Sequence, residues 1–138
     1  MKKDALSVAL HFLKFRPRSV FEIKQKLKTK GFEDKEIERL ISVFKKEKLL
    51  DDQKFAKMWV RDRDLLKPEG SFLLKLELRK LGISDNDIEN ALKDQDEEKL
   101  ARQALESKSR LKQADFAKKA AFLQRRGFKT SIIYQILK

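Results

Sequence analysis

The chain has 138 residues and a formal net charge of +12. It contains no cysteine, which excludes a disulfide framework and thiolate chemistry. No apolar run approaches the ~20 residues that a membrane-spanning helix needs. The first residues lead directly into an amphipathic pattern without a signal-peptide core. We therefore expect a cytoplasmic protein that makes no membrane contact.

The charge is unevenly distributed along the chain. Residues 1–50 carry a net charge of +7, residues 51–98 a net charge of −4, and residues 99–138 a net charge of +9. Basic ends favour contact with a polyanion, whereas an acidic middle favours contact with a protein surface. The simpler alternative is that these charges only solvate helix faces.

One pattern of residues occurs three times, centred on a glycine. A leucine one turn before a glycine, on a basic amphipathic stretch, indicates a helix that ends there, because glycine adopts the left-handed conformation at low cost. Apolar residues six and ten positions after the glycine share one face of a new helix. The copies are Leu27, Gly31, Phe32, Ile37 and Ile41; Leu78, Gly82, Ile83, Ile88 and Leu92; and Leu123, Gly127, Phe128, Ile133 and Leu137.

The repeat extends upstream of each glycine. An alanine stands 26 residues before it, and a residue suited to cap a helix N-terminus stands 12 residues before it. Each unit therefore contains three helices. The chain is predicted to be all-α, with three tandem three-helix repeats at residues 1–50, 51–95 and 96–138. The alanines are Ala5, Ala56 and Ala101, and the caps are Ser19, Gly70 and Asp115.

The first repeat begins with a helix that carries a clean apolar stripe. Pro17 ends this helix, because the residue before a proline disfavours the helical conformation. Ser19 and Glu22 have capping-box spacing at the start of the next helix. The first helix is predicted from Ala5 to the segment Arg16–Ser19, the second over Val20–Lys30, and the third from about Asp34 to about Lys48.

The second repeat begins at a pair of aspartates. Asp51 or Asp52 is predicted to cap its first helix, since no third ligand lies near enough in sequence to make a metal site. Trp59 continues the apolar face, so we expect a core residue rather than a base-stacking platform. The charged residues 61–64 are predicted to form a solvated helix end, and an acidic third helix follows over Ser84–Leu92.

The third repeat is basic, like the first. Residues 107–113 are predicted to connect its first two helices, and Asp115 to cap the second. Thr130 is predicted to cap the last helix.

Motifs of catalysis are absent from the sequence. Nothing reads as a phosphate-binding glycine loop, a nucleophile–base pair or a metal cluster, and His11 is the only histidine. We expect no enzyme activity, no cofactor and no metal. Tandem helical units instead bury a continuous core and expose one long face, which suits binding.

A helix, a glycine turn and a helix also form the helix-turn-helix geometry of DNA readers. A recognition helix offers Arg, Lys, Asn or Gln to base edges. The third helix of the second repeat instead carries Asp85, Asp87 and Glu89. The sequence thus disfavours specific readout and favours non-specific phosphate contact through basic side chains.

Five short motifs follow one another along nearly the whole chain. Together, in this order and spacing, they resemble the RecX family of recombination regulators. Lys48 departs from the family pattern, in which a small or turn-forming residue is common at that point. The motifs are Arg16-x-Arg18-Ser19, Lys30-Gly31-Phe32, Leu49-Leu50-Asp51-Asp52 with Phe55-Ala56, Glu77-Leu78-Arg79-x-x-Gly82-Ile83, and Arg125-Arg126-Gly127-Phe128.

The resemblance implies an elongated, curved, all-helical protein without chemistry of its own. It further implies binding to the filament that RecA recombinase forms on single-stranded DNA. Binding there would restrain ATP hydrolysis, strand exchange or filament growth. Affinity for bare single-stranded DNA is expected to be weak and non-specific, duplex DNA could bind as well, and we expect a monomer.

Eight basic residues are candidates for contact with the filament or DNA. The alternative for each is solvated surface, or a cation favoured by the last turn of a helix. If they bind, replacing Arg125 and Arg126 by alanine should weaken filament binding and leave thermal stability nearly unchanged. The candidates are Arg16, Arg18, Lys24, Lys28, Arg79, Lys80, Arg125 and Arg126.

Two other classes of function also fit the sequence. One is a non-specific nucleic-acid-binding helical protein without RecA specificity, and the other is a structural adaptor that binds no nucleic acid. Salt dependence separates them, because each neutralised phosphate adds about −0.9 to the log–log slope on duplex DNA. An adaptor would show little slope.

Overall fold

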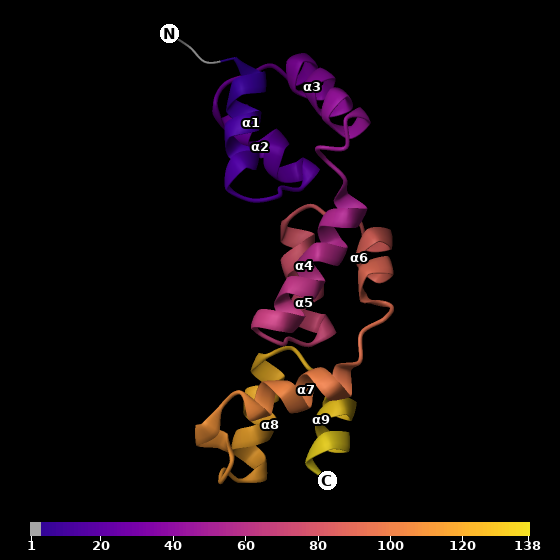
Figure 1. Ribbon diagram of the computed structural model, residues 1–138. Coiled ribbons are helices and arrows are strands. Elements are labelled where there is room, and N and C mark those ends of the chain that lie inside the picture. Colours follow the sequence, from indigo (N-terminus) through magenta and orange to yellow (C-terminus); the bar gives the residue numbers. More distant parts are fainter. Residues whose placement is uncertain (1–3) are drawn as a thin grey trace.

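The structure is a computed structural model that describes residues 4–138. All regular elements in this range are helices, and Figure 1 shows them in one elongated array. Among these residues, no helix combines the length and the apolarity needed to cross a bilayer. The elements are α1 (Ala5–Phe15), α2 (Val20–Thr29), α3 (Asp34–Lys46), α4 (Asp52–Leu66), α5 (Ser71–Lys80), α6 (Asp85–Leu92), α7 (Glu97–Glu106), the 3-10 helix η1 (Ser109–Leu111), α8 (Phe116–Arg125) and α9 (Thr130–Leu137).

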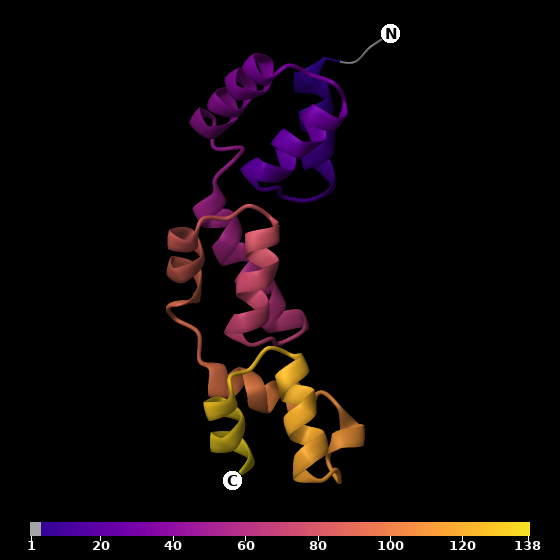
Figure 2. The same ribbon diagram turned by 180° about the vertical axis from the view of Figure 1, so that it is seen from behind.

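The helices group in threes, and each group encloses a separate apolar core. The all-α class and the tandem three-helix repeats are therefore confirmed. In both views the third helices α3, α6 and α9 lie along one side of the array, with the second helices on the other side (Figures 1 and 2). Fully buried side chains at the centre of the cores include Ile23, Leu27 and Phe44; Leu74, Leu78 and Ile88; and Leu123.

The glycine turns form as the spacing predicts. Gly31, Gly82 and Gly127 have φ angles of 89°, 78° and 85°, which lie in the left-handed region that favours glycine. In each repeat, the residue after the glycine donates its N–H to the carbonyl of the leucine that stands four residues before the glycine. The N···O distances are 3.1 Å for Phe32 to Leu27, 3.0 Å for Ile83 to Leu78 and 3.1 Å for Phe128 to Leu123. This bond closes the end of the second helix in every repeat.

Most helix starts follow the predicted caps. Ser19 and Glu22 form the reciprocal capping box, and Asp51, rather than Asp52, caps α4 by accepting from the N–H of Lys54 at 3.1 Å. The prediction for Thr130 is wrong. Lys129 occupies the cap position of α9 without a side-chain hydrogen bond, and Thr130 is the first helical residue.

Three predicted boundaries or environments also differ from the structure. Helix α3 ends at Lys46, because Lys48 adopts a left-handed φ of 61° that stops the helix. Residues 107–113 contain η1, whose Leu111 is buried in the third core. Arg63 and Asp64 are only partly exposed, because α5 and the segment before α7 cover this end of α4.

Adjacent repeats are joined in the same way at both junctions. The start of the second helix in one repeat meets the glycine turn of the next repeat. At the first junction, the Ser19 hydroxyl donates to the carbonyl of Leu81 at 2.6 Å. At the second, the Gly70 N–H donates to the carbonyl of Arg126 at 2.7 Å. Side chains at Gly70, Gly82 and Gly127 would each overlap the facing repeat, so close approach also requires these glycines.

Candidate functional site

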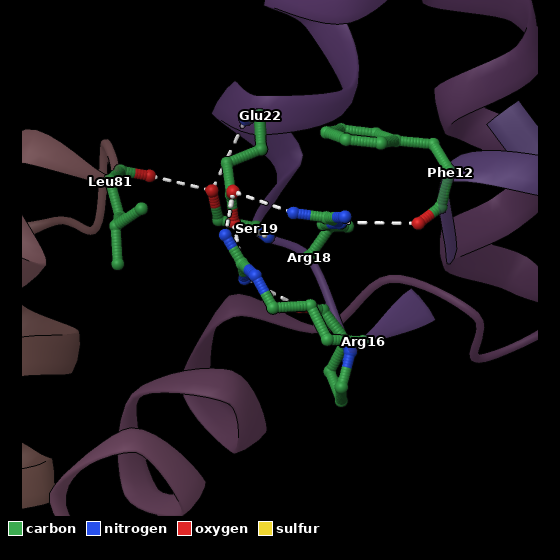
Figure 3. A network of polar contacts seen from close by, with 7 residues as sticks. Phe12, Arg16, Arg18, Ser19, Glu22 and Leu81 are labelled. Carbon is green, nitrogen blue, oxygen red and sulfur yellow. Dashed lines mark hydrogen bonds and ion pairs between the residues drawn. The ribbon is translucent and has the colours of Figure 1, made fainter. Parts of the chain in front are cut away.

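Arg16 and Arg18 belong to a polar network at the first junction, shown in Figure 3. Arg16 forms an ion pair with Glu22 and donates to the carbonyl of Pro17 at 2.8 Å. The Arg18 Nε donates to the carbonyl of Phe12 at 3.2 Å, and its guanidinium lies 3.7 Å from the centre of the Phe12 ring. Both arginines thus brace the capping box of α2.

Arg18 is the more enclosed of the two arginines. Only 13% of its side chain is exposed, and a second ion pair joins it to Glu22 at 3.6 Å. Burial lowers the pKa of its guanidinium, and the charge of Arg16 adds to this effect. The Arg18 charge is therefore largely occupied within the repeat, and its contact with filament or DNA stays a prediction.

Lys24 and Lys28 lie on α2 and face α3. Lys24 pairs with Glu38 at 3.1 Å, and Lys28 pairs with Asp34 at 3.9 Å. Both pairs are largely exposed, so they contribute little stability, and contact of these lysines with filament or DNA stays a prediction.

Arg79 and Lys80 form the last turn of α5. Arg79 pairs with Asp85 at 3.2 Å, again at an exposed position. Lys80 is exposed and lines an open groove of about 310 Å³ at the first junction, together with Phe21 and Lys26. Residues from two repeats thus place two cations beside a partly exposed aromatic ring.

Arg125 and Arg126 have different environments despite being neighbours. Arg125 is exposed and has no ion pair within residues 4–138. Arg126 donates to the carbonyl of Pro68 at 3.0 Å and lies over the Phe122 ring at 4.8 Å, at the second junction. Arg125 is therefore free for an external anion, whereas Arg126 holds two repeats together.

The exposed candidates share one position in the repeat. Lys28, Lys80 and Arg125 lie two or three residues before the turn glycine, at the end of the second helix. Successive repeats therefore present a cation at equivalent points along the array. The structure does not gather the eight candidates into a single cluster.

Two carboxylate sites, one at Asp52 and one around Glu69, were not anticipated from the sequence. Asp52 accepts from the Val20 N–H at 2.9 Å across the first junction, and burial raises the pKa of its carboxyl. Asp52 follows the cap in sequence, so only the packing of repeats reveals its contact with α2.

The second carboxylate site lies near the second junction. Arg63 Nε lies 3.1 Å from an oxygen of Glu77 and 3.5 Å from an oxygen of Glu69, and Trp59 Nε1 donates to Glu77 at 2.9 Å. Glu69 is only 3% exposed. Burial, together with the nearby Glu77 carboxylate, raises the pKa of Glu69 to about 7. Within residues 4–138, no group of three metal-ligating side chains is arranged to hold an ion.

Comparison with known proteins decides the family. The models of the first and second three-helix domains of RecX match residues 5–42 and 51–92. The regulatory protein RecX of Chlorobaculum tepidum is 35% identical over 141 residues, which cover 99% of this chain and 88% of that protein. The chain belongs to the RecX family. The Mycolicibacterium smegmatis RecX is 31% identical over 148 residues, with 99% and 79% coverage.

Other RecX proteins match over a smaller share of their length. The match covers 62% of the Prosthecochloris aestuarii protein, at 39% identity over 94 residues, and 34% of the Leuconostoc mesenteroides protein, at 32% identity over 90 residues. The chain therefore spans less than two thirds of these RecX relatives.

Solved structures agree with the family. The crystal structure of RecX from Lactobacillus salivarius superimposes with a TM-score of 0.84, at 26% identity, and covers 96% of this chain and 91% of that one. A second crystal structure of regulatory protein RecX has the same TM-score at 24% identity and supports the fold.

Proposed function

We propose that this chain binds the filament that RecA recombinase forms on single-stranded DNA and restrains its ATPase, strand exchange or extension. It acts in the cytoplasm as a monomer and by contact alone. Membership of a family of regulatory proteins supports this role. The observation that carries it is an elongated helical array with basic end repeats and an acidic middle segment over residues 51–98.

A nucleoprotein filament presents phosphates and protein side by side. Basic end repeats suit the phosphates, and exposed cations such as Lys28 and Arg125 are available for them. The acidic segment over residues 51–98 repels phosphates and suits protein. A ligand of mixed character therefore matches the charge distribution better than DNA alone does.

Sequence-specific DNA reading fits this arrangement poorly. Helix α6, which stands where a recognition helix would, carries Asp85, Asp87 and Glu89. Arg79 pairs with Asp85 instead of balancing a phosphate. Contact with any nucleic acid should therefore be independent of base sequence.

The experiment compares binding to two probes at the same salt concentration. One probe is a fluorescent single strand coated with RecA, and the other is the same strand bare. We expect binding to the RecA-coated strand at a concentration at least tenfold lower than binding to the bare strand. Equal affinities would overturn the proposal.

A second candidate is non-specific nucleic-acid binding, and the free side chain of Arg125 and the net charge of +12 favour it. This function predicts equal affinity for both probes. It also predicts a steep salt dependence, with a log–log slope of about −0.7 for each phosphate neutralised on a single strand.

A further inference from the structure

The second junction carries an open groove outside the candidate sites described above. Its volume is about 520 Å³. The end of α4 forms one wall, α7 forms the other, and the segment between α6 and α7 completes it. The groove therefore belongs to two repeats and exists only when they are docked.

Two leucines stand exposed at the rim of this groove. Leu65 is 76% exposed and Leu66 is 83% exposed, the largest values for any large apolar side chain among residues 4–138. Apolar side chains that are exposed side by side next to a hollow are typical of surfaces that bind another protein. Neither leucine contributes to the core of the middle repeat.

The groove is electronegative, although the chain as a whole is strongly basic. Asp64, Asp94 and Asp96 line it, and Lys99 is the single base among the lining residues. Asp96 is partly occupied, because it accepts from the N–H of Lys99 at 3.2 Å as the cap of α7. Asp94 is exposed and makes no hydrogen bond or ion pair with the described residues.

Two acceptor atoms of the lining residues have no hydrogen-bond donor. Asp64 Oδ1 and Gln95 Oε1 are shielded from solvent and have no hydrogen-bond partner within residues 4–138. The other oxygen of Asp64 accepts from the Gln95 amide, and burial raises the pKa of the Asp64 carboxyl. A buried acceptor without a donor is costly. A ligand in the groove can reach the exposed carboxylate of Asp94 rather than these two shielded atoms.

We propose that this groove receives a segment of a protein partner in which an arginine or lysine is flanked by apolar residues. The basic side chain lies beside Asp94 and Asp96, and the apolar neighbours cover Leu65 and Leu66. Charge complementarity selects this occupant, because an acidic segment or a phosphate would meet carboxylates. The inference rests on the proposed function and assigns the groove to the protein component of the filament, leaving the DNA to the basic repeats.

A pair of charge reversals tests this assignment. Asp94→Lys and Glu36→Lys change the net charge equally, and both carboxylates are exposed. Glu36 lies on α3 of the first repeat and does not line the groove. We expect Asp94→Lys to weaken binding to the RecA-coated strand at least tenfold and Glu36→Lys to leave it unchanged or stronger.

The bare strand serves as the internal control. Both variants should bind it equally well, and at least as tightly as the wild type, because each adds positive charge. Equal effects of the two variants on the RecA-coated strand would overturn the groove while leaving the proposed function standing. Failure of the wild type itself to prefer the coated strand would overturn both.

A second pair of variants tests the apolar half of the groove. Leu65→Ser with Leu66→Ser should lower affinity for the RecA-coated strand at least tenfold. Leu6→Ser with Leu10→Ser, at half-exposed positions on α1, should not. Thermal unfolding of the Leu65/Leu66 variant should match the wild type, because those side chains are outside the core. Unchanged affinity in that folded variant would contradict the proposal.

Discussion

Lys48 is the only residue other than glycine with a positive φ between residues 4 and 138, at 61°. Its N–H donates to the carbonyl of Lys45 at 3.1 Å, so it terminates α3 in the way that a glycine usually does. A left-handed conformation costs a lysine about 1 kcal/mol or more. The sequence marked this position as a departure from the family pattern, and the backbone shows what the departure costs.

We predict that Lys48→Gly preserves or slightly raises stability. Glycine adopts the left-handed φ without strain, and this gain balances or outweighs the higher conformational entropy of the unfolded chain. The matched variant Lys45→Gly, inside α3, should lose about 1 kcal/mol. Urea denaturation of the two variants measures both free energies of unfolding. Equal losses would show that Lys48 is not strained.

The raised pKa of Glu69 leads us to predict that stability depends on pH. Its pKa is raised from 4.5 to about 7 in the folded chain, so the folded state binds its proton more tightly than the unfolded state. The protonated Glu69 carboxyl contributes to the free energy of unfolding below pH 4.5, and this contribution is lost as the pH rises to about 7. Glu69→Gln should therefore gain stability relative to the wild type across this range.

Thermal unfolding at several pH values measures this effect, and the difference between the two proteins isolates Glu69. Asp52 and Asp64 also have raised pKa values, but they are present in both proteins and cancel. Parallel pH profiles would mean that the Glu69 carboxyl titrates normally.

Single replacements of Arg125 and Arg126 should have different effects on stability and on DNA binding. Arg126→Ala should lower the free energy of unfolding by about 1–2 kcal/mol, because it loses a partly buried hydrogen bond to Pro68 and contact with Phe122. Arg125→Ala should change stability by less than about 0.5 kcal/mol and weaken binding to single-stranded DNA. This replaces the expectation that the double alanine variant would leave stability unchanged. Chemical denaturation and DNA titration of both single variants measure the two effects.

At the scale of elements, the repeat junction is the feature that sequence reasoning could not reach. The glycine turns and most caps are local, so the spacing of a few residues predicts them. The bond from Ser19 to Leu81 joins residues far apart in the chain, and no local pattern encodes it. One signal was available. Gly70 stands where the other repeats have Ser19 and Asp115, and a cap without a side chain indicates close approach of another backbone.

The junction predicts unequal costs for two equivalent substitutions. A side chain at Gly31 would meet nothing within 4 Å, whereas one at Gly82 would overlap Phe21 of the first repeat. Gly31→Ala should therefore cost about 1 kcal/mol, from the backbone alone. Gly82→Ala should cost about 3 kcal/mol, because the steric overlap adds to the backbone term.

Denaturant titration of both alanine variants measures these costs. The Gly82 variant should also lose cooperativity, since its first repeat no longer docks on its second. Equal losses in the two variants would show that the junction does not depend on the absence of a side chain at Gly82.

At the scale of the whole molecule, three repeats of one fold carry different charges. The fold class followed from periodicity, and the basic ends followed from counting residues. Which cations are free could not be predicted, because Arg18 and Arg126 differ from Lys80 and Arg125 only in what packs against them. The groove at the second junction was likewise hidden, since its walls come from separate repeats.

The most direct test of filament recognition is the ATPase rate of RecA on single-stranded DNA, titrated with this protein. Binding to the bare strand is measured beside it at the same salt concentration. We expect inhibition at concentrations well below those that coat the bare strand, because recognition requires the filament. Inhibition that begins only when the bare strand would be saturated would contradict filament recognition and leave simple competition for phosphates.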